Sequence, residues 1–295
     1  MATLYTHQSQ NVRKTWFLMT TFFILIIAIG YAFSYYYQNP NILYIFLVFS
    51  IGMNIYSYWN SDKVAIKLSG AIPADPIQYK ELHNIVENLS ITAGLPKPKV
   101  YIINDTAPNA FATGRDKDHS AVAVTTGLLQ ILDKNEIEGV IAHELSHIGN
   151  RDILVSTVAV VLAGFITIVA DFFIRSQMFG GRSRDDDSKA GGALMVIGIV
   201  LAILAPIFAS LIQLAISRKR EFLADASGAL LTRYPEGLAS ALQKISQYSQ
   251  PMAKASKATA HLFIANPFGA NKIKSLFATH PPVEARVEAL LGKKS

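Results

Sequence analysis

The stretch NEIEGVIAHELSHIGNRD, residues Asn135–Asp152, carries two histidines separated by three residues, with a glutamate directly after the first. A capping-box pattern, formed by Asp133 and Glu136, predicts a helix from Lys134 to Ile148, and Gly149 suits its C-cap. Residues four apart lie on one face of a helix, so both imidazoles can reach one metal ion. The stretch therefore predicts a metal-binding helix whose histidines lie half buried at the border of its apolar face.

Three residues of this helix are predicted to carry the chemistry. His143 and His147 are the candidate metal ligands, and Glu144 is placed to take a proton from the attacking water. A catalytic zinc has three protein ligands and an open fourth position, so one more ligand is required. The chain contains no cysteine, which restricts that ligand to histidine, aspartate or glutamate. A chance match of the short pattern is the alternative.

The apolar residues are concentrated in segments long enough to cross a membrane. Of the 295 residues, 51% are hydrophobic and only 16% are charged, and Thr15–Ser61 contains no charged residue. We predict four spans, each close to the length that a bilayer requires: Trp16–Tyr36, Ile42–Tyr58, Val155–Ala170 and Ala193–Ser217. A helix pair buried in a soluble core is the alternative, but core helices are rarely free of charge over such a length.

The basic residues beside the predicted spans indicate their orientation. Arg13, Lys14, Lys63 and Lys67 flank the first pair and Arg218–Arg220 follows the fourth span, whereas the turn between spans one and two is uncharged. The positive-inside rule then places both chain termini and the histidine helix in the cytoplasm. The net charge is +6, but no basic run is interleaved with aromatic residues, so no nucleic-acid partner is expected.

The spans divide the chain into four parts. We predict an N-terminal arm and the first two spans over residues 1–61, and the first part of a soluble domain over 62–152. Residues 153–217 would hold the last two spans with an external loop, and 218–295 the second part of that domain. Three short strands and three further helices are predicted in the soluble parts: strands at Lys99–Ile103, Asn109–Gly114 and Ser120–Thr125, and helices beginning at Asp75–Pro76, Pro235 and Pro282.

Membrane topology restricts the search for the third ligand. A residue that completes the site must lie in the same compartment as the histidines, so an even number of spans must separate them. Directly after the fourth span stand Glu221 and Asp225, again four apart on a predicted helix. Glu221 can bind the metal, while Asp225 can orient a ligating histidine through its other ring nitrogen. The alternative is that both are solvated charges beside Arg218–Arg220.

The two motifs together resemble a known protease pattern. HELSH followed by Glu221-Phe-Leu-Ala-Asp225 resembles the gluzincin metalloproteases, in which a glutamate on a second helix completes the zinc site. With the four spans, Asn109–Gly114 and Thr279–Pro282, nearly the whole chain resembles the HtpX-type heat-shock zinc metalloproteases, an integral-membrane gluzincin family of bacteria. The resemblance implies an α+β fold: a four-span α-helical membrane protein with a cytoplasmic zincin-type domain, mostly helical with a small sheet.

The same resemblance implies a function. It implies one Zn²⁺ per chain and an endopeptidase that hydrolyses peptide bonds of misfolded membrane proteins, in quality control and stress response. The implied location is the bacterial plasma membrane, with the active site at the cytoplasmic face. Membrane-protein substrates and the lipid bilayer are the implied partners, and self-cleavage or a homo-oligomer is left open.

Substrate contacts are implied at one predicted strand. Asn109, Ala110, Phe111 and Ala112 resemble the gluzincin edge strand that pairs with the substrate backbone. An exposed edge offers N–H and C=O groups to an extended peptide regardless of its side chains. An ordinary core strand with Phe111 buried is the alternative.

The remaining assignments are weaker. His280 is expected to donate to the developing oxyanion as a catalytic residue, to cover the open position of the metal, or to be structural. Arg286 is expected to hold the loop that carries His280. Two functions compete with the protease described above. One is a non-catalytic membrane chaperone or scaffold with a structural metal, which Glu144 disfavours because such a site needs no base. The other is a CAAX-prenyl-type endopeptidase, which the resemblance disfavours because those relatives have more spans.

Overall fold

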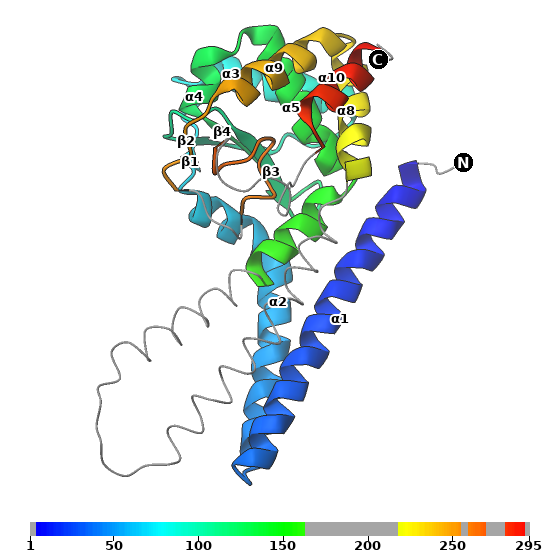
Figure 1. Ribbon diagram of the computed structural model, residues 1–295, viewed down its shortest axis with the longest axis vertical. Coiled ribbons are helices and arrows are strands. Elements are labelled where there is room, and N and C mark those ends of the chain that lie inside the picture. Colours follow the sequence, from blue (N-terminus) through cyan, green and yellow to red (C-terminus); the bar gives the residue numbers. More distant parts are fainter. Residues whose placement is uncertain (1–3, 163–217, 255–258, 270–280, 293–295) are drawn as a thin grey trace.

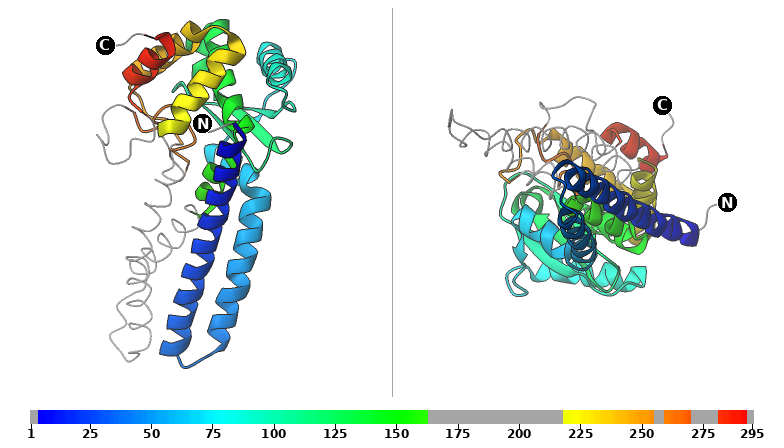
Figure 2. Two further views of the ribbon diagram at one scale, coloured as in Figure 1. Left: turned by 90° about the vertical axis from the view of Figure 1, so that its right-hand side faces the viewer. Right: turned by 90° about the horizontal axis from the view of Figure 1, so that it is seen from below.

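The computed structural model describes residues 4–162, 218–254, 259–269 and 281–292. Two long helices, α1 (Leu4–Tyr36) and α2 (Asn41–Ser69), run side by side away from a globular domain (Figures 1 and 2). Each contains a stretch that is long and apolar enough to cross a membrane: Ser9–Tyr35, with a mean hydropathy of 2.1, and Asn41–Asn60, with 1.5. The first two predicted spans are therefore present as helices.

The later spans fall largely outside the described residues. The third predicted span begins within a helical segment, Asp152–Leu162, and its remainder and the fourth span lie in residues 163–217, which the structure does not describe. Asp152–Leu162 follows the helix α5 (Lys134–Gly149) at a bend of 84°, and the two would pass as one broken span by length and composition alone. We assign α5 to the globular domain because its apolar residues belong to that domain's core.

A small mixed sheet forms one layer of the domain. Its strands are β1 (Ile72–Pro73), β2 (Lys99–Ile103), β3 (Ala110–Gly114) and β4 (Ser120–Thr125), in the order β1-β2-β4-β3. β2 and β4 are parallel, whereas β1 pairs with β2 and β3 pairs with β4 in antiparallel fashion. The three predicted strands are confirmed, and β3 lies at one edge of the sheet.

Alternating side chains of the strands pack on the two faces of this sheet. Ala110 and Ala112 of β3 join the main core, which lies between the sheet and the helices. Phe111 points to the opposite face, where its ring meets that of Phe263 at 5.1 Å between centroids. Every residue of β3 and β4 is consequently buried. The helices that complete the domain are α3 (Lys80–Ala93), α4 (Thr126–Ile131), α5, α8 (Arg218–Thr232), α9 (Pro235–Gln247) and α10 (Val283–Leu291).

Two helix ends differ from the prediction. The first helix of the domain begins at Lys80 rather than at Asp75–Pro76, because the Asp75 carboxylate accepts the N–H groups of Ile77 and Gln78 and holds a turn there. The helix α5 starts as predicted, with both halves of the Asp133 capping box formed. It continues through Gly149, however, and Asn150 is the C-cap.

The predicted boundary between the first and second parts falls within a helix. Residue 61 lies inside α2, which continues without a break to Ser69. Ala65, on this continuation, is fully buried in the cluster around Phe111 and Phe263. The end of α2 is therefore part of the globular domain and connects it to the helix pair without a break.

Candidate metal centre

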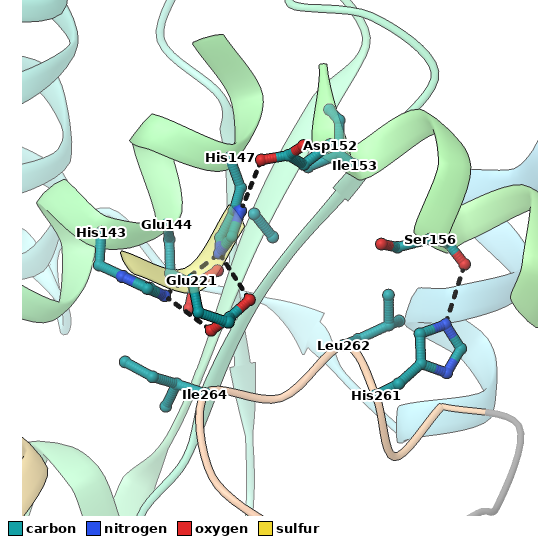
Figure 3. Close-up of a pocket in the computed structure, with 11 residues that line it drawn as sticks. His143, Glu144, His147, Asp152, Ile153, Ser156, Glu221, His261, Leu262 and Ile264 are labelled. Atoms are coloured by element: carbon teal, nitrogen blue, oxygen red, sulfur yellow. Dashed lines mark hydrogen bonds and ion pairs between the residues drawn. The ribbon is translucent and has the colours of Figure 1, made fainter. Parts of the chain in front are cut away.

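Two helices bring the three predicted ligands together (Figure 3). His143 and His147 lie on α5, and Glu221 lies in the first turn of α8, which packs along α5. The Nε2 atoms of the two histidines are 3.2 Å apart, and Glu221 carboxylate oxygens lie 3.7 Å and 3.6 Å from them. Within the described part of the chain, this is the one group of three His, Asp or Glu residues whose ligand atoms all lie within 4.8 Å of one another.

These separations fit a tetrahedral zinc ion. Bonds of ~2.0–2.1 Å at tetrahedral angles place neighbouring donor atoms about 3.3 Å apart. The three separations of 3.2, 3.6 and 3.7 Å lie close to that value, so small side-chain adjustments would complete the coordination. Two imidazoles and one carboxylate also form a donor set that hydrolytic zinc sites use. The residues present therefore fit zinc.

The other ring nitrogen of each histidine faces a carboxylate. Nδ1 of His143 lies 2.9 Å from Oδ1 of Asp225, and Nδ1 of His147 lies 3.1 Å from Oδ2 of Asp152. A carboxylate at this distance keeps the proton on Nδ1 and leaves the Nε2 lone pair for a metal. Two Nε2 lone pairs that face each other at 3.2 Å repel unless a cation lies between them. That cation is either a proton on one ring or a metal ion.

Asp225 is itself held by a buried arginine. Arg286 on α10 is 1% exposed, and its Nε and Nη2 donate to the two Asp225 carboxylate oxygens at 2.8 and 2.7 Å. Burial by itself would raise the pKa of Asp225. The hydrogen bonds from Arg286 and His143 outweigh burial, so the pKa lies below its ordinary value. Arg286 thus contacts α8 directly. The loop of His280, which Arg286 is predicted to hold, lies outside the described residues.

The predicted base is deeply buried. Glu144 is 2% exposed, and burial raises the pKa of its carboxyl to about 7, although a hydrogen bond from the backbone of Ala112 opposes the rise. A carboxyl with a pKa near neutrality suits a general base at physiological pH. His143 is also fully buried, at 1% exposure, rather than half buried as expected, because α8 covers the side of α5 that it occupies.

Residues after α9 close the site on another side. The pocket at the three ligands has a cavity volume of about 40 Å³ and is lined in part by His261, Leu262 and Ile264 (Figure 3). His261 carried no sequence signal, yet it is buried and its Nε2 lies 3.2 Å from the Ser156 carbonyl oxygen. A space of this size holds an ion or a water molecule but no peptide.

The predicted substrate strand lies beside this pocket. β3 is at the sheet edge and Ala112 lines the pocket, but the Ala110 carbonyl already accepts the N–H of Ile264 at 2.9 Å. The Asn109 side chain also exchanges two hydrogen bonds with the Ala265 backbone. The chain itself therefore pairs with the outer edge of β3 next to the metal ligands, and Phe111 is a core residue.

Comparison with known proteins points to one family. Residues 76–294 match peptidase family M48. The chain is 51% identical over 292 residues to a protein of Caldanaerobacter subterraneus subsp. tengcongensis described as "Protease HtpX homolog", covering 98% of this chain and 97% of that protein. A protein of Thermoanaerobacter pseudethanolicus with the same description is 50% identical over 292 residues, with the same coverage of both chains. The crystal structure of S. mikatae Ste24p has a similar fold, with a TM-score of 0.53 at 19% identity; the match covers 92% of this chain and 62% of that one.

Proposed function

The chain belongs to peptidase family M48 as an HtpX-type metalloprotease, and on this premise we propose that it is a zinc endopeptidase whose metal ligands are His143, His147 and Glu221. The observation that carries the proposal is the convergence of these three donors, at 3.2 to 3.7 Å, beside a buried glutamate. The family membership disfavours the non-catalytic chaperone or scaffold. The description shared by relatives at about half identity favours the HtpX type over a CAAX-prenyl-type endopeptidase.

The chain's own residues have distinct tasks in the proposed hydrolysis. When bound, zinc supplies Lewis-acid chemistry that polarises a carbonyl and makes water nucleophilic near pH 7. Glu144 takes the proton from the attacking water and delivers it to the leaving amine. Asp225 holds the imidazole of His143 in the ring orientation that turns Nε2 toward the metal. A substrate strand that adds to β3 would have to replace the Ile264 hydrogen bond to Ala110.

The arrangement of aromatic and basic residues supports a membrane-adjacent site. Exposed Trp16 lies in the N-terminal half of α1 and exposed Trp59 in the C-terminal half of α2, the halves nearer the globular domain, whereas exposed Tyr35 lies at the opposite end of α1. Trp16 and Tyr35 are 19 positions apart on one helix, or about 28 Å at 1.5 Å per residue, which matches a hydrocarbon core of ~30 Å. Arg13 and Lys14 stand at the domain end as well. This pattern favours a domain on the cytoplasmic face, with the last two predicted spans returning the chain to that side.

Membrane proteins are the proposed substrates. The candidate ligands lie close in sequence to the predicted third and fourth spans. A loosened cytoplasmic loop of a neighbouring membrane protein would therefore reach them before most soluble proteins. This proximity fits a role in membrane-protein quality control in the bacterial plasma membrane. Self-cleavage and a homo-oligomer stay predictions.

The hydrolytic mechanism is tested by Glu144→Gln, which preserves the side-chain shape but cannot accept the proton. We expect the purified variant to retain zinc while cleavage of an unfolded membrane-protein substrate falls by ~10²–10⁴-fold or more. Glu138→Gln, a partly exposed position on the same helix, is the matched control and should cleave like wild type. A fully active Glu144→Gln chain, or wild-type cleavage unaffected by chelator, would contradict the mechanism.

The proposed topology is tested by cysteine labelling, since the chain has no cysteine of its own. Single cysteines are introduced at Ser188 and at Ser295, two positions outside the described residues. With four spans and cytoplasmic termini, an impermeant thiol reagent should label intact cells at position 188 and require lysis to label position 295. Labelling of both positions from one side would refute the even number of spans between the two zinc motifs.

A further inference from the structure

We propose that Asp152 is a positioning residue for the metal ligand His147, and that Asn11 on the first membrane helix holds Asp152 in place. The inference rests on the proposed zinc site and extends it. It makes the N-terminal helix part of the metal centre's support rather than a membrane anchor alone.

The contacts form an unbroken buried chain. The Asn11 amide nitrogen donates to Oδ1 of Asp152 at 2.6 Å, and Oδ2 of Asp152 lies 3.1 Å from Nδ1 of His147. Asn11 and Asp152 are both buried, each with 4% of its surface exposed. A buried carboxylate with both oxygens occupied has one stable orientation, and it imposes that orientation on the imidazole.

Further contacts tie this chain to both halves of the site. The Asn11 amide also donates to the backbone carbonyl of Asn150, the C-cap of α5, at 3.1 Å. Arg220 Nη1 lies 3.5 Å from Oδ1 of Asp152, and Arg220 directly precedes the candidate ligand Glu221. Asp152 therefore links α1, α5 and α8 at one point. A movement of α1 at this level would change the contacts of ligands on both of the other helices.

The position of Asn11 is set by apolar packing farther along α1. Leu18 and Phe22, two and three turns beyond Asn11, are buried against Leu154 and Val158 of the segment that begins with Asp152. This cluster fixes the position of α1 along its axis relative to Asp152. The polar contact is thus made at a defined level of α1, one to two turns before the predicted span Trp16–Tyr36 begins.

A purely structural role for Asp152 must be distinguished from a positioning role. Asp152 begins a helical segment, where a negative side chain stabilises the helix without any metal. Loss of that effect would lower the melting temperature of the zinc-free chain and leave zinc affinity unchanged. Loss of ligand orientation would lower zinc affinity beyond any change in the zinc-free melting temperature.

The test uses the full chain in detergent, with zinc itself as the probe. Zinc affinity is measured by competition with a chelator, and the melting temperature of the zinc-free protein is measured beside it. We expect Asp152→Asn to weaken zinc binding by about 10- to 100-fold, and Asn11→Ala to weaken it in the same direction by less. Gln10→Ala, an exposed position next to Asn11, is the matched control and should bind zinc like wild type.

The possible outcomes separate this inference from the proposed function. The inference is overturned if Asp152→Asn binds zinc as tightly as wild type, or if Asn11→Ala weakens zinc binding no more than Gln10→Ala does. Neither result would affect the proposed zinc site itself. Wild-type protein that binds no zinc would overturn the proposed function itself.

Discussion

Gly228 on α8 is a point of close approach between the two helices that carry the metal ligands. It lies seven residues after Glu221, on the face of α8 that meets α5. A Cβ atom placed on Gly228 would stand 2.9 Å from the backbone nitrogen of His143 and 3.1 Å from its Cα. Both neighbours are helix backbone and cannot rotate away. Gly228→Ala must therefore push α8 and α5 apart.

The size of the displacement follows from the contact distances. Ordinary contacts of a Cβ atom begin near 3.4 Å, so the helices must separate by about 0.5 Å. Metal–ligand distances tolerate about 0.2 Å, which means that Glu221 and His143 can no longer reach one ion without strain. Overpacking of this kind costs about 1–3 kcal/mol. If zinc has to overcome that cost by drawing the helices together, its affinity falls by roughly 5- to 150-fold.

The assay compares two glycines on the two ligand helices. Gly149→Ala, at the end of α5, would place a Cβ 3.8 Å from a Leu95 methyl carbon, which is an ordinary contact. Chelator competition should show weakened zinc binding for Gly228→Ala and unchanged binding for Gly149→Ala. Replacing a helical glycine by alanine alone stabilises a helix by up to ~1 kcal/mol, so Gly149→Ala should melt no lower than wild type. Wild-type zinc affinity in Gly228→Ala would refute the close-approach argument.

Two further outcomes follow from the charges around the site. Asp225→Ala should weaken zinc binding about 10- to 100-fold, which chelator competition measures. It should also lower the free energy of unfolding of the zinc-free chain by ~3–5 kcal/mol, because Arg286 stays buried without the carboxylate to which it donates. Unchanged zinc affinity and unchanged stability in denaturation would contradict the contact. Burial holds the pKa of His143 at about 4, whereas Asp152 and Glu221 outweigh burial and raise the pKa of metal-free His147 to about 9. Zinc binding at pH 8 should therefore release about one proton from His147, and zinc affinity should fall as the pH drops below 9. Calorimetry in buffers of different ionisation enthalpy counts this proton, and a release near zero would contradict the assignment.

Local sequence patterns were sufficient for the parts of the site that lie within one helix. The capping box at Asp133 and the spacing of His143 and His147 act over a few residues, and a helix turns them into two imidazoles on one face without help from the rest of the chain. Glu221 is distant in sequence, but membrane topology restricted where a third ligand could stand. Glu221 meets that requirement, and its carboxylate lies beside both histidines in the structure.

Contacts between distant segments were decided only by the tertiary structure. Nothing in the sequence connects Asn11 to Asp152, which are 141 positions apart, and Asp225 meets Arg286 across 61 positions. The close approach at Gly228 is likewise a property of two packed helices. The coverage of the β3 edge by Ile264 also appears only once the chain is folded. Helix periodicity and capping are short-range effects that the sequence by itself determines. The partner of a buried polar group depends instead on which surfaces pack together, and the packing of surfaces is decided by the whole core at once.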